Sequence, residues 1–153
     1  MIRKTVIAVV IAGAMAAVPL AGCSSNTDPV NVSYADGVYE GTSQVYEGDS
    51  DGSAAGYGVV KITISDGKIT DCEYHTYEPD GKLKDEDYGK KNGEVANKDF
   101  YNKAQRAVQA CQKYAEQLAA TGDIGSVDAI SGATISYNEF KEAAEDALGK
   151  ARV

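Results

Sequence analysis

The chain has 153 residues, which is enough for one folded domain and too few for two of ordinary size. Its 15 basic and 23 acidic residues give a formal net charge of −8, which excludes a nucleic-acid binder that works through a basic face. A single His and three Cys argue against a zinc site with several ligands and against a disulfide scaffold, so we predict no bound metal.

The amino-terminal segment has the pattern of an export signal. Arg3 and Lys4 precede an apolar stretch over residues 5–18, and small residues lead up to Cys23. The stretch is too short for a comfortable transmembrane helix. The tetrad Leu-Ala-Gly-Cys that ends at Cys23 resembles the lipobox of bacterial lipoproteins. An uncleaved anchor with a chance Cys at this place is the alternative interpretation.

The lipobox resemblance implies a signal peptide over residues 1–22 and a lipid group on Cys23, which becomes the new amino terminus. Two acyl chains would hold the protein on the outer face of a bacterial membrane, because one chain alone binds a bilayer marginally. Residues 23–35 are polar, contain Pro29 and show no periodicity, which predicts a flexible tether. The folded domain is expected over residues 36–150.

Three β-strands are expected in the first half of this domain. Residues 38–47 are rich in Val, Tyr and Thr, and a turn or loop follows over residues 48–53. Residues 57–65 alternate apolar and polar side chains, which predicts a strand with one buried face. Residues 68–74 resume a β-rich pattern after a break of two residues.

That break predicts a tight hairpin turn. Asp66-Gly67 between two β-rich runs favours a type I′ turn, which needs positive φ at both central residues. In this register Ile64 faces Ile69 across the hairpin. Farther from the turn the pairing meets acidic residues such as Asp71, so we expect a β-bulge or a half-solvated strand.

A long charged loop over residues 78–98 separates the strands from the first helix, and the sequence leaves open whether it is a solvated connection or a binding loop. Residues 99–120 carry an apolar stripe that predicts a helix, with Asp99 capping its start and Gly122 its end. The stripe consists of Phe100, Ala104, Ala107, Val108, Cys111, Ala115 and Leu118.

A second helix is predicted over residues 137–148, with Ser136 and Glu139 forming a capping box at its start. Its buried face would consist of Phe140, Ala143, Ala144, Ala147 and Leu148. Strands that come first and helices that follow predict an α+β fold, in which an antiparallel β-sheet packs against the C-terminal helices in a single domain.

The segment between the two helices carries the residues of chemical interest. Residues 128–134 read Asp-Ala-Ile-Ser-Gly-Ala-Thr, and by composition alone they form a loop that enters a helix. A helix amino terminus also binds phosphate, because its N–H groups are unpaired and its dipole is positive there. A phosphate on Thr134 would lie near these N–H groups, and Gly132 and Ala133 leave the hydroxyl group open to approach.

This segment resembles the flavinylation motif Asp-x-x-Ser-Gly-Ala-Thr of the FMN-binding domain family. The resemblance implies FMN linked to Thr134 through a phosphoester, in a bond that an exported FMN transferase makes from FAD. Ser136 stands where the family often has a second hydroxyl residue. The recognition segment would consist of Asp128, Ser131, Gly132 and Ala133.

The resemblance continues outside the motif. Residues 36–41 resemble the opening strand of the family, and residues 56–69 resemble its central hairpin. Many members carry a His and then Glu-Thr-Pro-Gly after the hairpin. Residues 75–81 read His-Thr-Tyr-Glu-Pro-Asp-Gly instead, so this loop departs from the family pattern and its flavin contacts are not assigned.

Several other residues have two interpretations. His75 is a general base or flavin contact, or a surface residue of a strand, and we favour the surface residue. Cys72 and Cys111 could form a disulfide outside the cytoplasm, but the place of Cys111 on an apolar stripe favours a buried free thiol. Tyr57, Tyr74 and Tyr77 could each stack on a flavin or pack in the core, and we favour packing in the core.

Together these features predict an electron-transfer flavoprotein with no catalytic residues of its own, rather than a stand-alone enzyme. By resemblance to flavin-carrying lipoproteins of extracellular electron transfer, it would relay electrons from a membrane quinol or NADH dehydrogenase system to an external acceptor. The alternative is a lipoprotein without flavin that acts as a binding module in ligand capture or adhesion. The presence of both Thr134 and Asp128 favours the flavoprotein.

Overall fold

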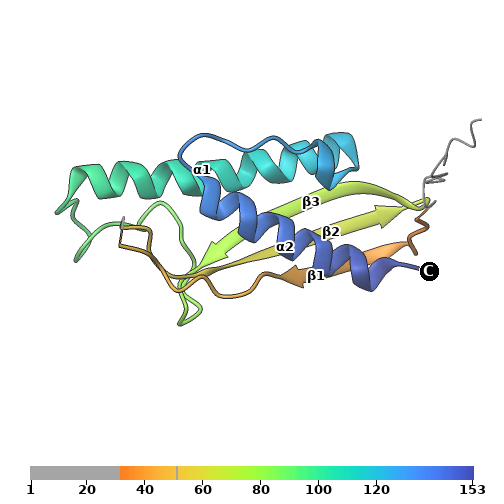
Figure 1. Ribbon diagram of the computed structural model, residues 1–153, viewed down its shortest axis with the longest axis horizontal. Helices are drawn as coiled ribbons and strands as arrows, with labels where there is room; N and C mark the ends of the chain where they lie inside the picture. The colour runs from red at the N-terminus through yellow and green to blue at the C-terminus, as the bar shows by residue number, and fades with distance from the viewer. Residues whose placement is uncertain (1–31, 51) are drawn as a thin grey trace, which may run out of the picture. The chain divides into compact units, whose positions relative to one another are not determined.

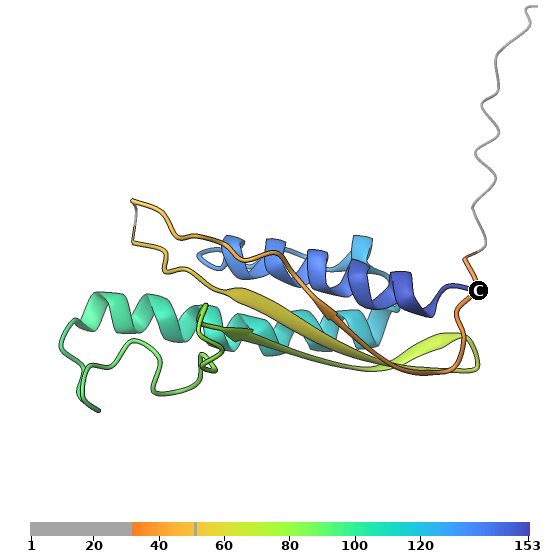
Figure 2. The ribbon, with the colours of Figure 1, turned by 90° about the horizontal axis from the view of Figure 1, so that it is seen from below.

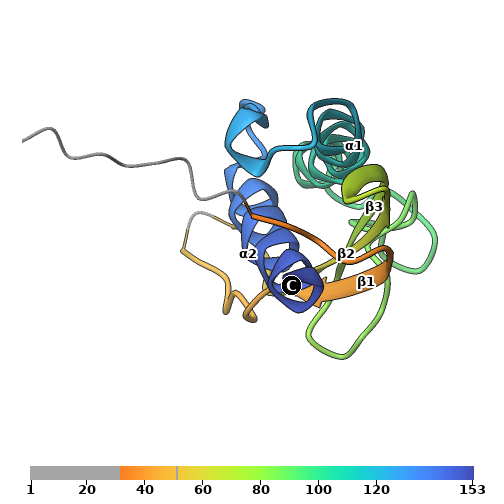
Figure 3. The ribbon, with the colours of Figure 1, turned by 90° about the vertical axis from the view of Figure 1, so that its right-hand side faces the viewer.

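The computed structural model describes residues 32–50 and 52–153. In chain order the elements are β1 Gly37–Thr42, β2 Tyr57–Ser65, β3 Lys68–Tyr77, α1 Lys98–Thr121, a short 3₁₀ turn η1 Ile124–Ser126 and α2 Thr134–Ala151. The strands form an antiparallel sheet in the order β1-β2-β3, and both long helices lie on one face of it (Figures 1 and 3). This is the predicted α+β fold. The expected signal peptide over residues 1–22 and the expected lipidation residue Cys23 lie outside the described residues.

The hairpin between β2 and β3 forms as predicted. Asp66 and Gly67 have φ values of 53° and 69°, the positive values that a type I′ turn requires. Ile64 pairs with Ile69, and the register then shifts by one residue, so that Thr70 is an extra residue on β3. This is the predicted bulge, and it keeps apolar side chains on both sides of Thr70 facing the helices.

β1 is shorter than predicted, because it ends at Thr42 and not near residue 47. The chain leaves the sheet there but remains beside β2. The N–H of Tyr46 donates to the carbonyl oxygen of Gly56 at 2.7 Å, and the N–H of Gly56 donates back at 2.9 Å. The segment after β1 is therefore held at the end of the sheet, where it forms one side of the site described below.

The free edge of β1 is covered by polar side chains of α2. The N–H of Thr42 donates to Asp146 Oδ2 at 3.0 Å, and the N–H of Gln44 donates to Glu142 Oε2 at 3.1 Å. Lys150 Nζ donates to a carbonyl oxygen of β1 at 2.8 Å. These bonds occupy backbone groups with which another strand could otherwise pair.

α1 begins one residue earlier than predicted and has a different cap. Asn97 Oδ1 accepts the N–H of Phe100 at 3.0 Å, so the N-cap is Asn97 and the prediction of Asp99 was wrong. Asp99 lies inside the first turn, where its negative charge suits the positive end of the helix dipole. At the other end Gly122 has a φ of 68° and its N–H bonds to the carbonyl oxygen of Leu118, as predicted.

α2 begins at Thr134, three residues before the predicted start. The predicted capping box was wrong: the N-cap is Ala133, and no side chain in the described part of the chain caps the first turn. Ser136 and Glu139 are 7% and 5% exposed, because this side of α2 faces the interior of the domain. The carbonyl oxygen of Ser136 accepts the Tyr74 hydroxyl group at 2.7 Å, which fixes the first turn of α2 to β3.

The core lies between the two helices and the sheet. Its largest fully buried side chains are Tyr114, Phe140, Ile62, Leu118 and Val60. Tyr114, which the predicted stripe did not include, stacks on Phe140 with ring centres 5.7 Å apart. Cys72 and Cys111 are buried free thiols, and burial raises the pKa of each to about 12, which makes them unreactive at neutral pH. His75 is exposed on β3, as favoured from the sequence.

Residues 33–35 pair with the end of the chain, although the tether was expected to reach residue 35. The N–H of Ala35 donates to the carbonyl oxygen of Ala151 at 2.9 Å, and the N–H of Val153 donates to that of Ser33 at 3.2 Å. The chain therefore enters the fold beside the last turn of α2 (Figures 1 and 2). Within the described ranges, every helix falls short of the length and apolar character needed to cross a membrane.

α2 approaches β1 most closely at Gly41. A Cβ atom at this position would collide with backbone atoms of Ala143 and Ala147. Ala143, Ala144 and Ala147 are fully buried, and their small side chains allow the helix to lie directly on the strand. Because backbone atoms cannot move aside as side chains can, the contact requires glycine at position 41.

We expect Gly41→Ala to lower the free energy of unfolding by about 2 kcal/mol or more, because the added methyl group forces α2 away from the sheet. Chemical denaturation followed by circular dichroism measures this change. Gly149→Ala is the matched control, since a Cβ atom at Gly149 meets nothing within 4 Å and should add about 0.5–1 kcal/mol of stability through helix propensity. Equal stability of Gly41→Ala and the wild type would contradict the packing described here.

Candidate functional site

A cavity of about 360 Å³ lies beside the amino-terminal end of α2. Its walls come from the first half of α1, the first turns of α2, the end of β3 and two loops that include Asp49 and Lys84. The loops after β1 and β3 and the start of α1 lie at the end of the domain opposite to residues 33–35 and the C-terminus (Figures 1 and 2). Small-molecule sites usually have volumes of about 300–1,000 Å³, so this cavity can hold a small ligand.

One wall of the cavity is apolar and belongs to α1. It consists of Phe100, Ala104, Ala107 and Val108. The sequence predicts these residues as part of a buried stripe, but Ala107 and Val108 are only partly buried because they face the cavity. This wall offers a flat ring system an apolar surface.

The first turn of α2 forms a polar end of the cavity. Thr134 is the first helical residue and is exposed, and Gly132 turns the chain into the helix with a φ of 81°. In the part of the chain that the structure describes, no side chain caps this turn and no acidic residue lies in it. The first N–H groups of an 18-residue helix are therefore available to an anion.

Tyr114 holds the loop that leads into α2. Its hydroxyl group accepts the N–H of Ile130 at 3.0 Å and donates to the carbonyl oxygen of Ala133 at 3.2 Å. The N–H of Asp128 donates to Gln117 Oε1 at 2.9 Å. Both contacts come from α1, so this helix fixes the backbone of the motif as well as one wall of the cavity.

The residues predicted to bind FMN fall into two groups. Those that line the cavity are Gly132, Ala133, Thr134 and Ser136. Asp128 and Ser131 are exposed and lie outside the cavity lining. The structure therefore places the second half of the motif against the cavity and leaves the first half accessible from solvent.

Charged side chains also line the cavity, namely Asp49, Lys84, Lys103 and Glu139. Lys103 Nζ donates to Ser53 Oγ at 3.4 Å. Lys84 Nζ lies 5.2 Å from the centre of the Tyr88 ring, and burial lowers the pKa of this lysine. The two ammonium groups add positive charge to a cavity that already contains the amino-terminal end of a helix.

Glu139 is the unusual polar residue in the cavity wall. It is 5% exposed, and no described residue gives its Oε1 atom a hydrogen bond. Burial raises the pKa of Glu139 from 4.5 to about 7, although the ammonium group of Lys84 acts in the opposite direction. A buried carboxyl oxygen without a protein partner, in the wall of a cavity, points to a contact with a bound ligand.

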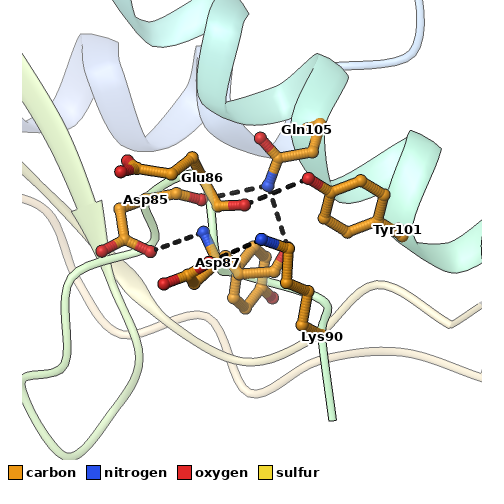
Figure 4. A network of polar contacts seen from close by, with 7 residues as sticks. Asp85, Glu86, Asp87, Lys90, Tyr101 and Gln105 are labelled. Atoms are coloured by element: carbon orange, nitrogen blue, oxygen red, sulfur yellow. Dashed lines mark hydrogen bonds and ion pairs between the residues drawn. The ribbon is translucent and has the colours of Figure 1, made fainter. Parts of the chain in front are cut away.

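The loop that carries Tyr88 is fixed on α1 (Figure 4). Gln105 Nε2 donates to the carbonyl oxygens of Asp85 and Tyr88 at 3.0 and 2.9 Å. The hydroxyl group of Tyr101 donates to the carbonyl oxygen of Glu86 at 3.1 Å. These contacts make this part of the long charged loop a wall of the cavity, to which Lys84 and Tyr88 contribute.

The model of the FMN-binding domain family matches residues 55–149 of the chain. The chain belongs to this family. The resemblance inferred from the sequence is thereby confirmed, and the protein is a flavin-binding protein.

Two solved structures resemble this FMN-binding domain. A crystal structure of a Clostridium perfringens protein has 25% sequence identity and a TM-score of 0.55, covering 77% of this chain and 88% of that one. A solution NMR structure of a Clostridium thermocellum protein has 20% identity and a TM-score of 0.39, covering 75% of this chain and 90% of that one. A search of curated proteins found no match.

The residues of the cavity fit FMN. The α1 wall suits the flat isoalloxazine ring, the start of α2 suits the phosphate, and the Glu139 carboxyl group can bond to a polar edge of the ring. When bound, FMN supplies reversible electron transfer. The residues of the cavity would bind the cofactor, orient it and shield part of it from water.

The tyrosines that were considered as stacking residues lie elsewhere. Tyr57 and Tyr77 stack on each other with ring centres 5.5 Å apart, and Tyr74 is buried in the core. The aromatic residues in the cavity lining are Tyr88 and Phe100. No pattern in the sequence pointed to Tyr88, because it lies in a loop without regular periodicity.

We expect the stability of the flavin-free protein to fall with rising pH because of Glu139. The unfolded chain releases this proton near pH 4.5 and the folded chain near pH 7, so the wild type loses about 2–3 kcal/mol between these values relative to Glu139→Gln. Chemical denaturation at a series of pH values measures the difference. Glu145→Gln, at an exposed position of α2, should follow the wild type, and parallel curves for wild type and Glu139→Gln would contradict the assignment.

Proposed function

We propose that this FMN-binding domain is an electron carrier that holds FMN covalently, through a phosphoester with the hydroxyl group of Thr134. The supporting observation is the position of Thr134, which is exposed at the first residue of an uncapped helix and lines the cavity. A phosphate linked there lies at the positive end of the α2 dipole, beside N–H groups that can bond to it. The link therefore places a negative charge where the protein stabilises it.

The exposed first half of the motif suits recognition by a separate FMN transferase. Asp128 and Ser131 lie on the solvent side of the loop before Thr134, where another protein can contact them. In the proposed attachment the Thr134 oxygen attacks the FMN phosphorus of FAD, AMP leaves, and the hydroxyl proton passes to solvent. Within the folded carrier these two residues then have no role in the cavity itself.

A carrier suits this cavity better than an enzyme with its own substrate. A volume of about 360 Å³ is at the lower end of the range for ligand sites, so FMN would fill it. Covalent attachment also prevents loss of the cofactor from a protein outside the cytoplasm. Electrons would come from a membrane quinol or NADH dehydrogenase system and pass to an external acceptor.

We also propose that the chain is exported and held on the outer face of a bacterial membrane by a lipid on Cys23. The support is the sequence pattern of a basic start, a short apolar stretch and the Leu-Ala-Gly-Cys tetrad. Two acyl chains on this residue give stable membrane binding without a membrane-spanning helix.

We expect the exported domain to gain the mass of one FMN less one water when it is produced together with an exported FMN transferase. Intact-mass spectrometry measures the gain. Thr134→Ala should abolish it, Thr134→Ser should retain it because the hydroxyl group is kept, and production without the transferase should give no gain. An unmodified wild type, with a transferase shown to be active on another acceptor, would overturn the covalent link and favour a binding module without covalent flavin.

We expect Cys23→Ala to remove the lipid and to move the protein from the membrane fraction to the soluble fraction of a bacterial host. Detergent phase partitioning of the full chain measures this change. Ser24→Ala, which keeps Cys23, is the control and should leave the protein with the membrane. A wild-type chain that partitions into the aqueous phase would contradict lipid anchoring.

A further inference from the structure

Glu139 and Thr134 lie on the same helix and line the same cavity. The two residues are five positions apart on α2, which corresponds to about 7.5 Å along the helix axis. Both line the same cavity, Thr134 at its exposed rim and Glu139 in its buried wall. FMN joined by its phosphate at Thr134 would have its ring at the other end of the molecule, and a ring held in this cavity would be within reach of the wall that contains Glu139.

The surroundings of Glu139 allow its carboxyl group to be neutral or charged. The titratable groups that face it are Lys84 and Tyr88 from the loop after β3, Tyr74 from β3, Cys111 from α1 and Glu142 from α2. Asp49 and Lys103 line the same cavity. β2 contributes Gly58, where a Cβ atom would lie 3.1 Å from that of Glu139.

Burial outweighs the charge of Lys84 at this residue and brings the pKa of Glu139 to about 7. Removal from water favours the neutral carboxyl group, and Lys84 favours the carboxylate. Because Oε1 has no partner among the described residues, no protein hydrogen bond locks either form. A small change in the charge of the cavity can therefore move a proton on or off Glu139.

We propose that Glu139 is the redox-linked proton site of the cavity: it takes up a proton from solvent when the bound flavin gains electrons and returns the proton when the electrons leave. This inference rests on the proposed function, since it requires electrons to enter a flavin held in this cavity. Glu139 acts here as a positioning and charge-compensating residue and transfers no electrons itself.

In the proposed step, the uptake of protons compensates the negative charge that the electrons bring into the cavity. An external reductant, which is dithionite in the experiment below, gives two electrons to the ring, and one proton from solvent binds to a ring nitrogen. One negative charge is then left in the cavity. The Glu139 carboxylate binds a second proton from solvent, so that two electrons and two protons have entered. Oxidation by an external acceptor reverses both proton movements.

The test is a redox titration of the flavin-loaded protein at a series of pH values between 6 and 8, with dye mediators and absorbance detection. The dependence of the midpoint potential on pH gives the number of protons taken up per two electrons. We expect the wild type and the exposed-site control Glu145→Gln to take up more protons than Glu139→Gln in this range, by as much as one. The isosteric Gln cannot bind the proton but keeps the shape of the side chain.

A second readout identifies the group directly. The reduced-minus-oxidised infrared difference spectrum should contain the C=O band of a newly protonated carboxyl group in the wild type, and this band should be absent in Glu139→Gln. If Glu139→Gln does not fold, Lys84→Met serves in its place. Loss of the ammonium group favours the neutral carboxyl group, so Lys84→Met should move the range of extra proton uptake to higher pH.

The outcomes separate this inference from the proposed function. The intact mass of each sample records whether flavin is attached at Thr134, independently of the titration. Attached flavin with equal proton uptake in wild type and Glu139→Gln, or without the carboxyl band, would overturn the role of Glu139 alone. A wild type without bound flavin would overturn both proposals.

Discussion

The contact between α2 and β1 determines the depth at which every residue of α2 lies. Gly41 and the alanine face let the helix rest directly on the strand, and its first turn is then held at a fixed height by the bond between Tyr74 and the Ser136 carbonyl oxygen. Thr134 consequently stays at the surface while Glu139, little more than one turn later, is buried. A helix lifted by one methyl group would admit water to the Glu139 carboxyl group and change both its ionisation and the shape of the cavity.

The features of the fold that depend on residues close together in the chain could be predicted from the sequence. The hairpin turn follows from the positive φ that Asp66 and Gly67 tolerate, and the end of α1 follows from Gly122 in the same way. The start of α2 could not be predicted, because Ser136 and Glu139 are buried against parts of the chain that are distant in sequence, such as Tyr74, which is 62 residues from Ser136. A pattern typical of a capping box was overridden by burial of both its side chains.

The candidate site shows the same division. Thr134 stands out because a helix terminus and a family motif coincide at one hydroxyl group. The apolar wall that α1 contributes to the cavity could not be recognised, because a stripe of apolar residues looks the same in sequence whether protein or a ligand packs against it. Ala107 and Val108 belong to the predicted buried stripe but face the cavity. Lys84 and Tyr88 reach the cavity only through contacts between a loop and a helix, which local sequence does not encode.

The pairing of residue 35 with the last turn of α2 has a consequence for how the domain would operate on a surface. Thr134 lies at the first turn of the same helix, which is 18 residues and about 27 Å long. The chain is thus attached at one pole of the domain and the cavity lies at the other. With a lipid on Cys23, the end of the domain that contains the cavity would be the end farther from the point where the chain leads to the lipid.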